Sequence, residues 1–118
     1  MNFSTPTLVI NKAISLKNLD RMIDVASTNN LVLRPHFKTH QSIEIGTWFK
    51  EKGVTSITVS SISMAKFFSS EWNDITIAFP LNILEIDKLN LMIRGNRVKL
   101  LIDSISSLKI LDGKLEDS

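Results

Sequence analysis

Three nitrogen-bearing side chains, Arg34, His36 and Lys38, occupy alternate positions directly after the apolar run Leu31–Leu33. Alternate side chains of a β-strand share a face, so these groups are predicted to project together where the strand ends. A lysine held among other cations and against apolar walls has its charged form disfavoured, and its neutral amine attacks carbonyl groups to form a Schiff base. Lys38 is therefore the candidate nucleophile, against the plainer alternative of a solvated lysine after a strand.

The neighbours of Lys38 have candidate roles and plainer alternatives. His36 is placed either to transfer a proton near neutral pH or to be a hydrogen-bonded core histidine. Arg34 is placed either to donate hydrogen bonds that tune nearby groups or to form a structural ion pair. His36 and His40 are four residues apart, the spacing of a helical metal pair, but Pro35 and the preceding strand argue against a helix there. We therefore predict no metal site, and His40 is expected in a loop or helix start near the site.

Short apolar runs alternate with helical patterns along the chain. The predicted strands lie near Leu31–Arg34, Ser56–Ser60, Asp74–Phe79 and Val98–Asp103. A helix is predicted after each of these strands. The first ends before Gly53, and the second is capped at Ser63. The third is capped at Asn82 and ends at Gly95, and the last runs from near Ser104 to Gly113. Another amphipathic helix follows a short strand at Leu8–Ile10 and closes at Asn29–Asn30. Consecutive βα units of this kind predict an α/β fold with a right-handed parallel sheet and no internal domain boundary.

Composition excludes several classes of protein. The 118 residues are 43% hydrophobic and 22% charged, which is ordinary for one small globular domain. The formal net charge is only +2 and the basic residues are scattered, so no nucleic-acid partner is expected. The chain has no cysteine, no signal-peptide pattern at its start and no apolar run of about 18 residues, so a cytoplasmic protein without a membrane partner is expected.

The segment from Arg34 to His40, RPHFKTH, resembles the cofactor-lysine segment of the D-threonine aldolase and eukaryotic-type D-serine dehydratase family. The barrel of that family is similar to the N-terminal domain of alanine racemase. Further segments look like barrel strands of the family, namely Thr5–Ile10, Ile57–Ser60, Asp74–Pro80 and Leu100–Ser104. The resemblance implies a parallel (β/α) barrel of the alanine racemase N-terminal type, of which residues 1–118 form about the first half. A whole barrel has eight strands in about 250 residues, so the C-terminal half-barrel and the family's β-domain are expected to be absent.

The resemblance also implies a function. Lys38 is expected to hold pyridoxal 5′-phosphate as a Schiff base, with His36, Arg34 and His40 as further cofactor-binding residues. The reaction would be aldol cleavage, dehydration or racemisation of a small D-amino acid. A divalent metal is expected only in the full-length enzyme, because its ligands come from the C-terminal domain, and a homodimer is the usual assembly. Gln41 and the segment 64–66 depart from the family pattern, which puts the choice of substrate in doubt.

Other interpretations stay open. One alternative is a non-catalytic carrier of pyridoxal phosphate, and another is an inactive fragment that only folds or assembles. Because an open half-barrel leaves unpaired strand edges, two copies are hypothesised to associate edge to edge. Polar residues at strand ends are expected either to touch a ligand or to cap helices, namely Ser60, Ser61, Ser63, Asp103 and Ser104.

Overall fold

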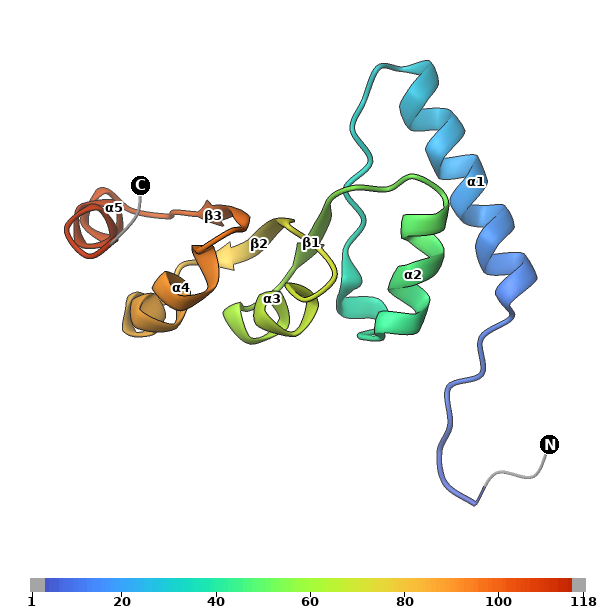
Figure 1. The fold of residues 1–118 in the computed structure, drawn as a ribbon, viewed down its shortest axis with the longest axis horizontal. Coiled ribbons are helices and arrows are strands. Elements are labelled where there is room, and N and C mark those ends of the chain that lie inside the picture. Colours follow the sequence, from blue (N-terminus) through green and yellow to red (C-terminus); the bar gives the residue numbers. More distant parts are fainter. Residues whose placement is uncertain (1–3, 116–118) are drawn as a thin grey trace. The chain divides into compact units, whose positions relative to one another are not determined.

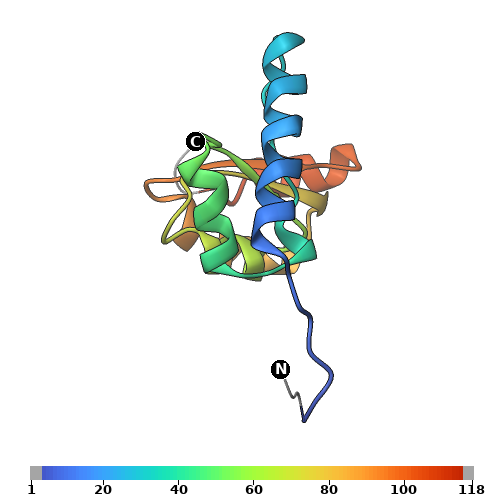
Figure 2. The ribbon, with the colours of Figure 1, turned by 90° about the vertical axis from the view of Figure 1, so that its right-hand side faces the viewer.

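The structure is a computed structural model that describes residues 4–115. The chain divides into two compact units between Leu33 and Arg34, where the sequence predicted no boundary. The first unit contains the predicted helix α1 (Lys12–Thr28), which is one continuous helix (Figure 2). Asn11 caps its start by accepting a hydrogen bond from the Ile14 N–H at 3.1 Å. Its end is confirmed at Asn29 and Asn30, where Asn30 has a φ of 54°.

The short strand predicted at Leu8–Ile10 is wrong, because this segment has no strand assignment in the structure. A strand exists only when its backbone groups pair with those of a neighbour. Within residues 4–115 the structure gives residues 8–10 no such neighbour. An apolar β-branched run alone is therefore not sufficient to form a strand here.

The second unit alternates helices and strands after a 3₁₀ turn (Figure 1). In chain order its elements are η1 (Phe37–Thr39), α2 (Ile43–Glu51), β1 (Ile57–Val59), α3 (Ile62–Phe68), β2 (Asp74–Pro80), η2 (Ile83–Glu85), α4 (Ile86–Ile93), β3 (Arg97–Leu101) and α5 (Ile105–Asp112). The described strands form a parallel sheet in the order β1-β2-β3, which confirms the predicted α/β class. None of the described helices is long and apolar enough to span a bilayer.

The strand predicted near Leu31–Arg34 is wrong. In the described part of the chain, the backbone of the segment from Arg34 pairs with the sheet at one parallel bridge, between His36 and Thr58 of β1. The Thr58 N–H donates to the Pro35 carbonyl at 2.8 Å, but Pro35 has no N–H to continue a ladder. The chain then turns into η1 at Phe37. The strands predicted at Ser56–Ser60, Asp74–Phe79 and Val98–Asp103 are confirmed, with ends moved by one or two residues.

Side-chain hydrogen bonds fix the helix starts. The Ser61 hydroxyl accepts from the Met64 N–H at 3.1 Å, so Ser61 caps α3 and the cap predicted at Ser63 is wrong by two residues. Ser104 caps α5 as predicted, by accepting from the Ser107 N–H at 3.1 Å. Gly53 and Gly95 follow α2 and α4 with φ values of 82° and 83°, the left-handed conformation that ends helices.

The two faces of the sheet differ in chemistry. The face toward α3 and α4 is apolar and buries Ile57, Val59, Ile75 and Ile77. The register aligns Thr58 with Thr76 and Thr76 with Lys99, and aligns Asp74 with Arg97. Because side chains alternate along a strand, these residues form an opposite, polar face of the sheet. The sheet therefore has a hydrophobic core on one side and charged groups on the other.

Candidate functional site

Lys38 lies in the 3₁₀ turn η1 and not on a strand. The His36 Nδ1 caps this turn by accepting from the Lys38 N–H at 3.3 Å. Gln41 closes it with a φ of 47° and donates from its side-chain amide to the Lys38 carbonyl at 3.4 Å. The predicted alternation of Arg34, His36 and Lys38 on one strand face is therefore wrong beyond His36, because the backbone leaves the extended conformation there.

The Lys38 side chain is exposed. Its amine has no hydrogen-bond or ion-pair partner among residues 4–115. The apolar walls expected around it are not formed by the described part of the chain. The ε-amine of Lys38, in the turn that follows the bridge at His36, is thus accessible to a carbonyl-bearing molecule.

His36 is the group that the structure brings next to Lys38. Partial burial and the nearby Lys38 charge lower the pKa of His36 below 6.5, so its ring is neutral near neutral pH. Because Nδ1 accepts the Lys38 N–H, the neutral ring carries its proton on Nε2. A neutral imidazole on the same turn can donate or accept a proton for a molecule bound there.

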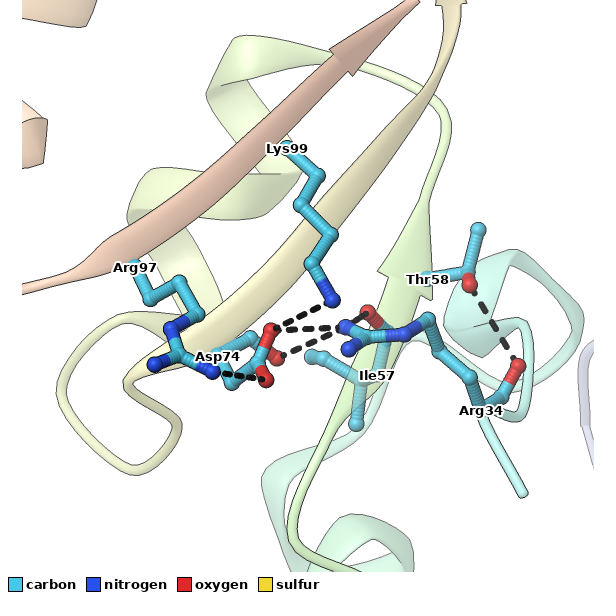
Figure 3. A network of polar contacts seen from close by, with 6 residues as sticks. All are labelled: Arg34, Ile57, Thr58, Asp74, Arg97 and Lys99. Atoms are coloured by element: carbon cyan, nitrogen blue, oxygen red, sulfur yellow. Dashed lines mark hydrogen bonds and ion pairs between the residues drawn. The ribbon is translucent and has the colours of Figure 1, made fainter. Parts of the chain in front are cut away.

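The side chain of Arg34 joins a charged network on the polar face of the sheet (Figure 3). Its Nη1 lies 2.8 Å from the Asp74 Oδ1 and also donates to the carbonyls of Ile57 and Asp74 at 3.4 Å. Arg97 and Lys99 approach the same carboxylate at 4.0 and 3.9 Å. Hydrogen bonding from Arg34 keeps the pKa of Asp74 below its usual value. The structure contains the ion pair considered for Arg34, and the role of Arg34 toward a cofactor stays a prediction.

Sequence reasoning missed Asp74, Arg97 and Lys99. Arg97 and Lys99 are alternate residues of one strand, and Asp74 begins the preceding strand. This spacing is a signal that could have placed two cations on one face of β3, but only the register of the strands aligns Asp74 with Arg97. The pairing of Asp74 with Arg34 spans 40 residues of sequence.

His40 lies in an aromatic cluster next to η1. The members of this cluster are Phe37, His40, Phe49, Phe67, Phe68 and Trp72. Its ring centroid is 4.5 Å from that of Phe37 and 5.8 Å from that of Phe49, which stacks on it. Its Nδ1 accepts from the Ser42 N–H at 3.2 Å, at the entry to α2. Its Nε2 is buried without a partner in the described part of the chain. These contacts fit the predicted helix-start position, and its role toward a cofactor stays a prediction.

The burial of His40 leads to a prediction about stability. Burial lowers the pKa of His40 below 6.5 in the folded state, while the hydrogen bond from Ser42 acts in the opposite direction. The neutral ring therefore contributes stability above pH 6.5, and this contribution is lost as the pH falls through the lowered folded value. The free energy of unfolding is measured by urea unfolding above and below pH 6.5. We expect His40→Phe, which keeps the ring packing, to lose less stability at the lower pH than the wild type does.

His36→Asn is the matched comparison. The pKa of His36 is also lowered, but its ring is less buried than that of His40. An unchanged pH dependence in His40→Phe would contradict the prediction.

The strand ends also carry a small cavity, of about 210 Å³. It lies beside the carboxyl ends of β1 and β2, and its polar lining includes Ser60, Ser61, Asn82 and Glu85. The Ser60 hydroxyl contacts the Met64 sulfur at 3.3 Å. Within residues 4–115 no three His, Cys, Asp or Glu side chains gather closely enough to hold a metal ion.

Comparisons with known proteins place these features in context. No family model matches the chain. The chain is 32% identical over 114 residues to D-serine dehydratase of Dictyostelium discoideum, covering 92% of this chain and 29% of the relative. The solved D-threo-3-hydroxyaspartate dehydratase from Delftia sp. HT23 is 29% identical with a TM-score of 0.85, covering 94% of this chain and 30% of that one.

A solved D-threonine aldolase from Filomicrobium marinum has a TM-score of 0.86 at 22% identity, covers 94% of this chain and 31% of that one, and shows the shared fold alone. The chain thus spans about 30% of the length of the relatives that it matches. The resemblance predicted from the segment Arg34–His40 is confirmed by relatives that cover most of the chain.

Proposed function

Starting from this resemblance, we propose that the chain is the lysine-bearing N-terminal part of a pyridoxal-phosphate-dependent lyase that acts on small β-hydroxy D-amino acids. Lys38 is the residue to which the cofactor attaches. The observation that carries the proposal is the accessible Lys38 amine within the shared motif, which has no partner among the residues that the structure describes. The names of the relatives, two dehydratases and an aldolase, support a lyase acting on a D-amino acid.

The residues around Lys38 fit the attachment of an aldehyde cofactor. The amine is accessible, and the neutral His36 beside it can hold or move a proton at Nε2. Pyridoxal phosphate, when bound, withdraws electrons from the substrate bond that breaks at the α-carbon. Phosphate groups favour glycine-rich turns and helix N-termini, and the four glycines of the chain form no such motif. We therefore assign only the attachment side of the cofactor to this chain.

We also propose that the sheet is part of a (β/α) barrel. Three parallel strands joined by helices, with one face covered by helices, are the arrangement of consecutive units of such a barrel. The polar face, with Thr58, Asp74, Thr76, Arg97 and Lys99, would then point to the barrel interior. A dimeric state and a cytoplasmic location stay predictions.

The test is borohydride reduction of the purified chain mixed with pyridoxal 5′-phosphate, followed by peptide mass mapping. Reduction makes the attachment permanent, so the labelled lysine can be read directly. We expect Lys38 to be labelled in preference to other exposed lysines such as Lys66 and Lys99. Equal labelling of these lysines would argue against a cofactor site at Lys38.

Addition of a D-amino acid distinguishes the proposed lyase from a carrier. D-Threonine with a divalent metal would be cleaved to glycine and acetaldehyde, and D-serine would be dehydrated with release of ammonia. A carrier would release none of these products. Since the chain covers about 30% of its relatives, this assay is best done on the longest natural form of the protein.

A further inference from the structure

We infer that Asp74 is a positioning residue for Lys38 and acts through Arg34. This inference deepens the proposed function, because it rests on Lys38 as the attachment residue. Its basis is the sparse backbone pairing between the Lys38 segment and the sheet. Within residues 4–115, the backbone of that segment pairs with β1 at one parallel bridge, so it lacks the repeated hydrogen bonds of a strand.

The side chain of Arg34 supplies much of the missing attachment. Its Nη1 reaches across β1 and donates to the carbonyl of Ile57 and to both the carbonyl and the carboxylate of Asp74 (Figure 3). On the backbone of the same segment, the Thr58 hydroxyl donates to the Arg34 carbonyl at 3.3 Å. Arg34 is thereby held at both its backbone and its guanidinium, four residues before Lys38.

The connection from Arg34 to Lys38 is short and ordered. After Arg34, the Pro35 carbonyl accepts from Thr58, and His36 caps the turn that contains Lys38. The proline ring restricts the backbone between the two hydrogen-bonded positions. A displacement of Arg34 would therefore be passed to the turn and change where the Lys38 amine lies.

Asp74 is the anion that keeps Arg34 in place. Its side chain is 22% exposed and that of Arg34 is 19% exposed, so their 2.8 Å contact is partly shielded from water. Arg97 and Lys99 stand within 4.0 Å of the same carboxylate. Without the Asp74 charge, three cations would face one another on the polar face, and Arg34 would be repelled as well as released. The contacts thus give Asp74 a larger effect than an isolated surface pair.

The first test compares Asp74→Asn with the wild type for labelling of Lys38 by pyridoxal phosphate and borohydride, across a range of pH. Loss of a charge-assisted hydrogen bond is expected to lower the labelling of Lys38 about tenfold. Asp74→Glu, which keeps the charge, is expected to recover part of it. The matched control is Glu71→Gln, which removes an exposed acid that pairs with Lys50 at 3.0 Å, and its labelling should equal that of the wild type.

The second test does not depend on the cofactor. In Asp74→Asn, amide hydrogen exchange should become faster at Thr58, whose N–H donates to the Pro35 carbonyl. The amides that join β2 and β3 should keep their protection. If Asp74→Asn does not fold, Arg34→Gln leaves the Asp74 charge facing Arg97 and Lys99, and the same selective change at Thr58 is expected.

The outcomes separate this inference from the proposed function. Selective exchange at Thr58 supports the inference even if the wild type is never labelled at Lys38, a result that would overturn the proposed function alone. Unchanged labelling and unchanged exchange in folded Asp74→Asn would overturn the inference. An equal loss of protection over the whole sheet would also overturn it, because Asp74 would then serve stability only.

Discussion

Replacing Phe37 with alanine is expected to lower the free energy of unfolding of the chain by about 3–5 kcal/mol. Phe37 is fully buried, and its ring lies at the centre of the aromatic cluster. The ring centroids of Phe49 and Phe68 are each 5.1 Å away, and that of Trp72 is 5.3 Å away, all edge to face. Small domains are stable by only about 5–15 kcal/mol, so much of the second unit's stability would be lost.

The packing around Phe37 leaves no ready substitute for its ring. A side chain added at Gly46 would place its Cβ 3.1 Å from the Phe37 ring, so α2 approaches the ring as closely as a glycine permits. Alanine at position 37 would therefore leave a cavity that neighbouring side chains fill only in part. Urea unfolding followed by circular dichroism measures the loss.

Phe67→Ala is the matched control for Phe37→Ala. Phe67 belongs to the same cluster, with its ring centroid 4.9 Å from that of Phe68, but its side chain is 51% exposed. We expect a loss clearly smaller than that of Phe37→Ala. Similar losses for both variants would mean that the cluster does not centre on Phe37.

Replacing Lys38 with arginine is expected to abolish the specific labelling by pyridoxal phosphate and borohydride while leaving the fold intact. A guanidinium stays charged in proteins and does not condense with an aldehyde as an amine does. Because the Lys38 side chain is exposed, the longer arginine side chain meets no packed neighbour. Peptide mapping measures the label, and urea unfolding verifies that stability is unchanged.

Lys66→Arg is the control for Lys38→Arg, since Lys66 is an exposed lysine in the last turn of α3. In the Lys66→Arg variant, labelling of Lys38 should equal that in the wild type. A Lys38→Arg variant that still takes up one specific label elsewhere would assign the attachment to another lysine.

The two substitutions affect adjacent residues with opposite surroundings. Phe37 points into the core, and Lys38 points to solvent from the same 3₁₀ turn. A core residue directly before Lys38 fixes the position of the turn, so Phe37→Ala is expected to reduce labelling of Lys38 as well. Stability and the proposed chemistry are thus connected through one short segment.

The sequence by itself determined the local and periodic features. Ser104 and Asn11 cap helices because a hydroxyl or amide oxygen can accept from the exposed N–H groups of the first turn. Gly53 ends α2 because it adopts a positive φ at little cost. The order of alternating strands and helices predicted the parallel sheet, and the motif around Lys38 predicted the family resemblance. These signals depend on residues close together in the chain.

Only the tertiary structure decided which distant groups meet and where extended segments end. The segment at Arg34 becomes a single bridge and a 3₁₀ turn because strand pairing depends on its neighbour β1 and on the missing N–H of Pro35. Asp74 reaches Arg34 across β1, and the strand register brings Arg97 and Lys99 to the same carboxylate. Sequence patterns predict which face a side chain takes, whereas the contacts between strands depend on packing and register, which no local pattern contains.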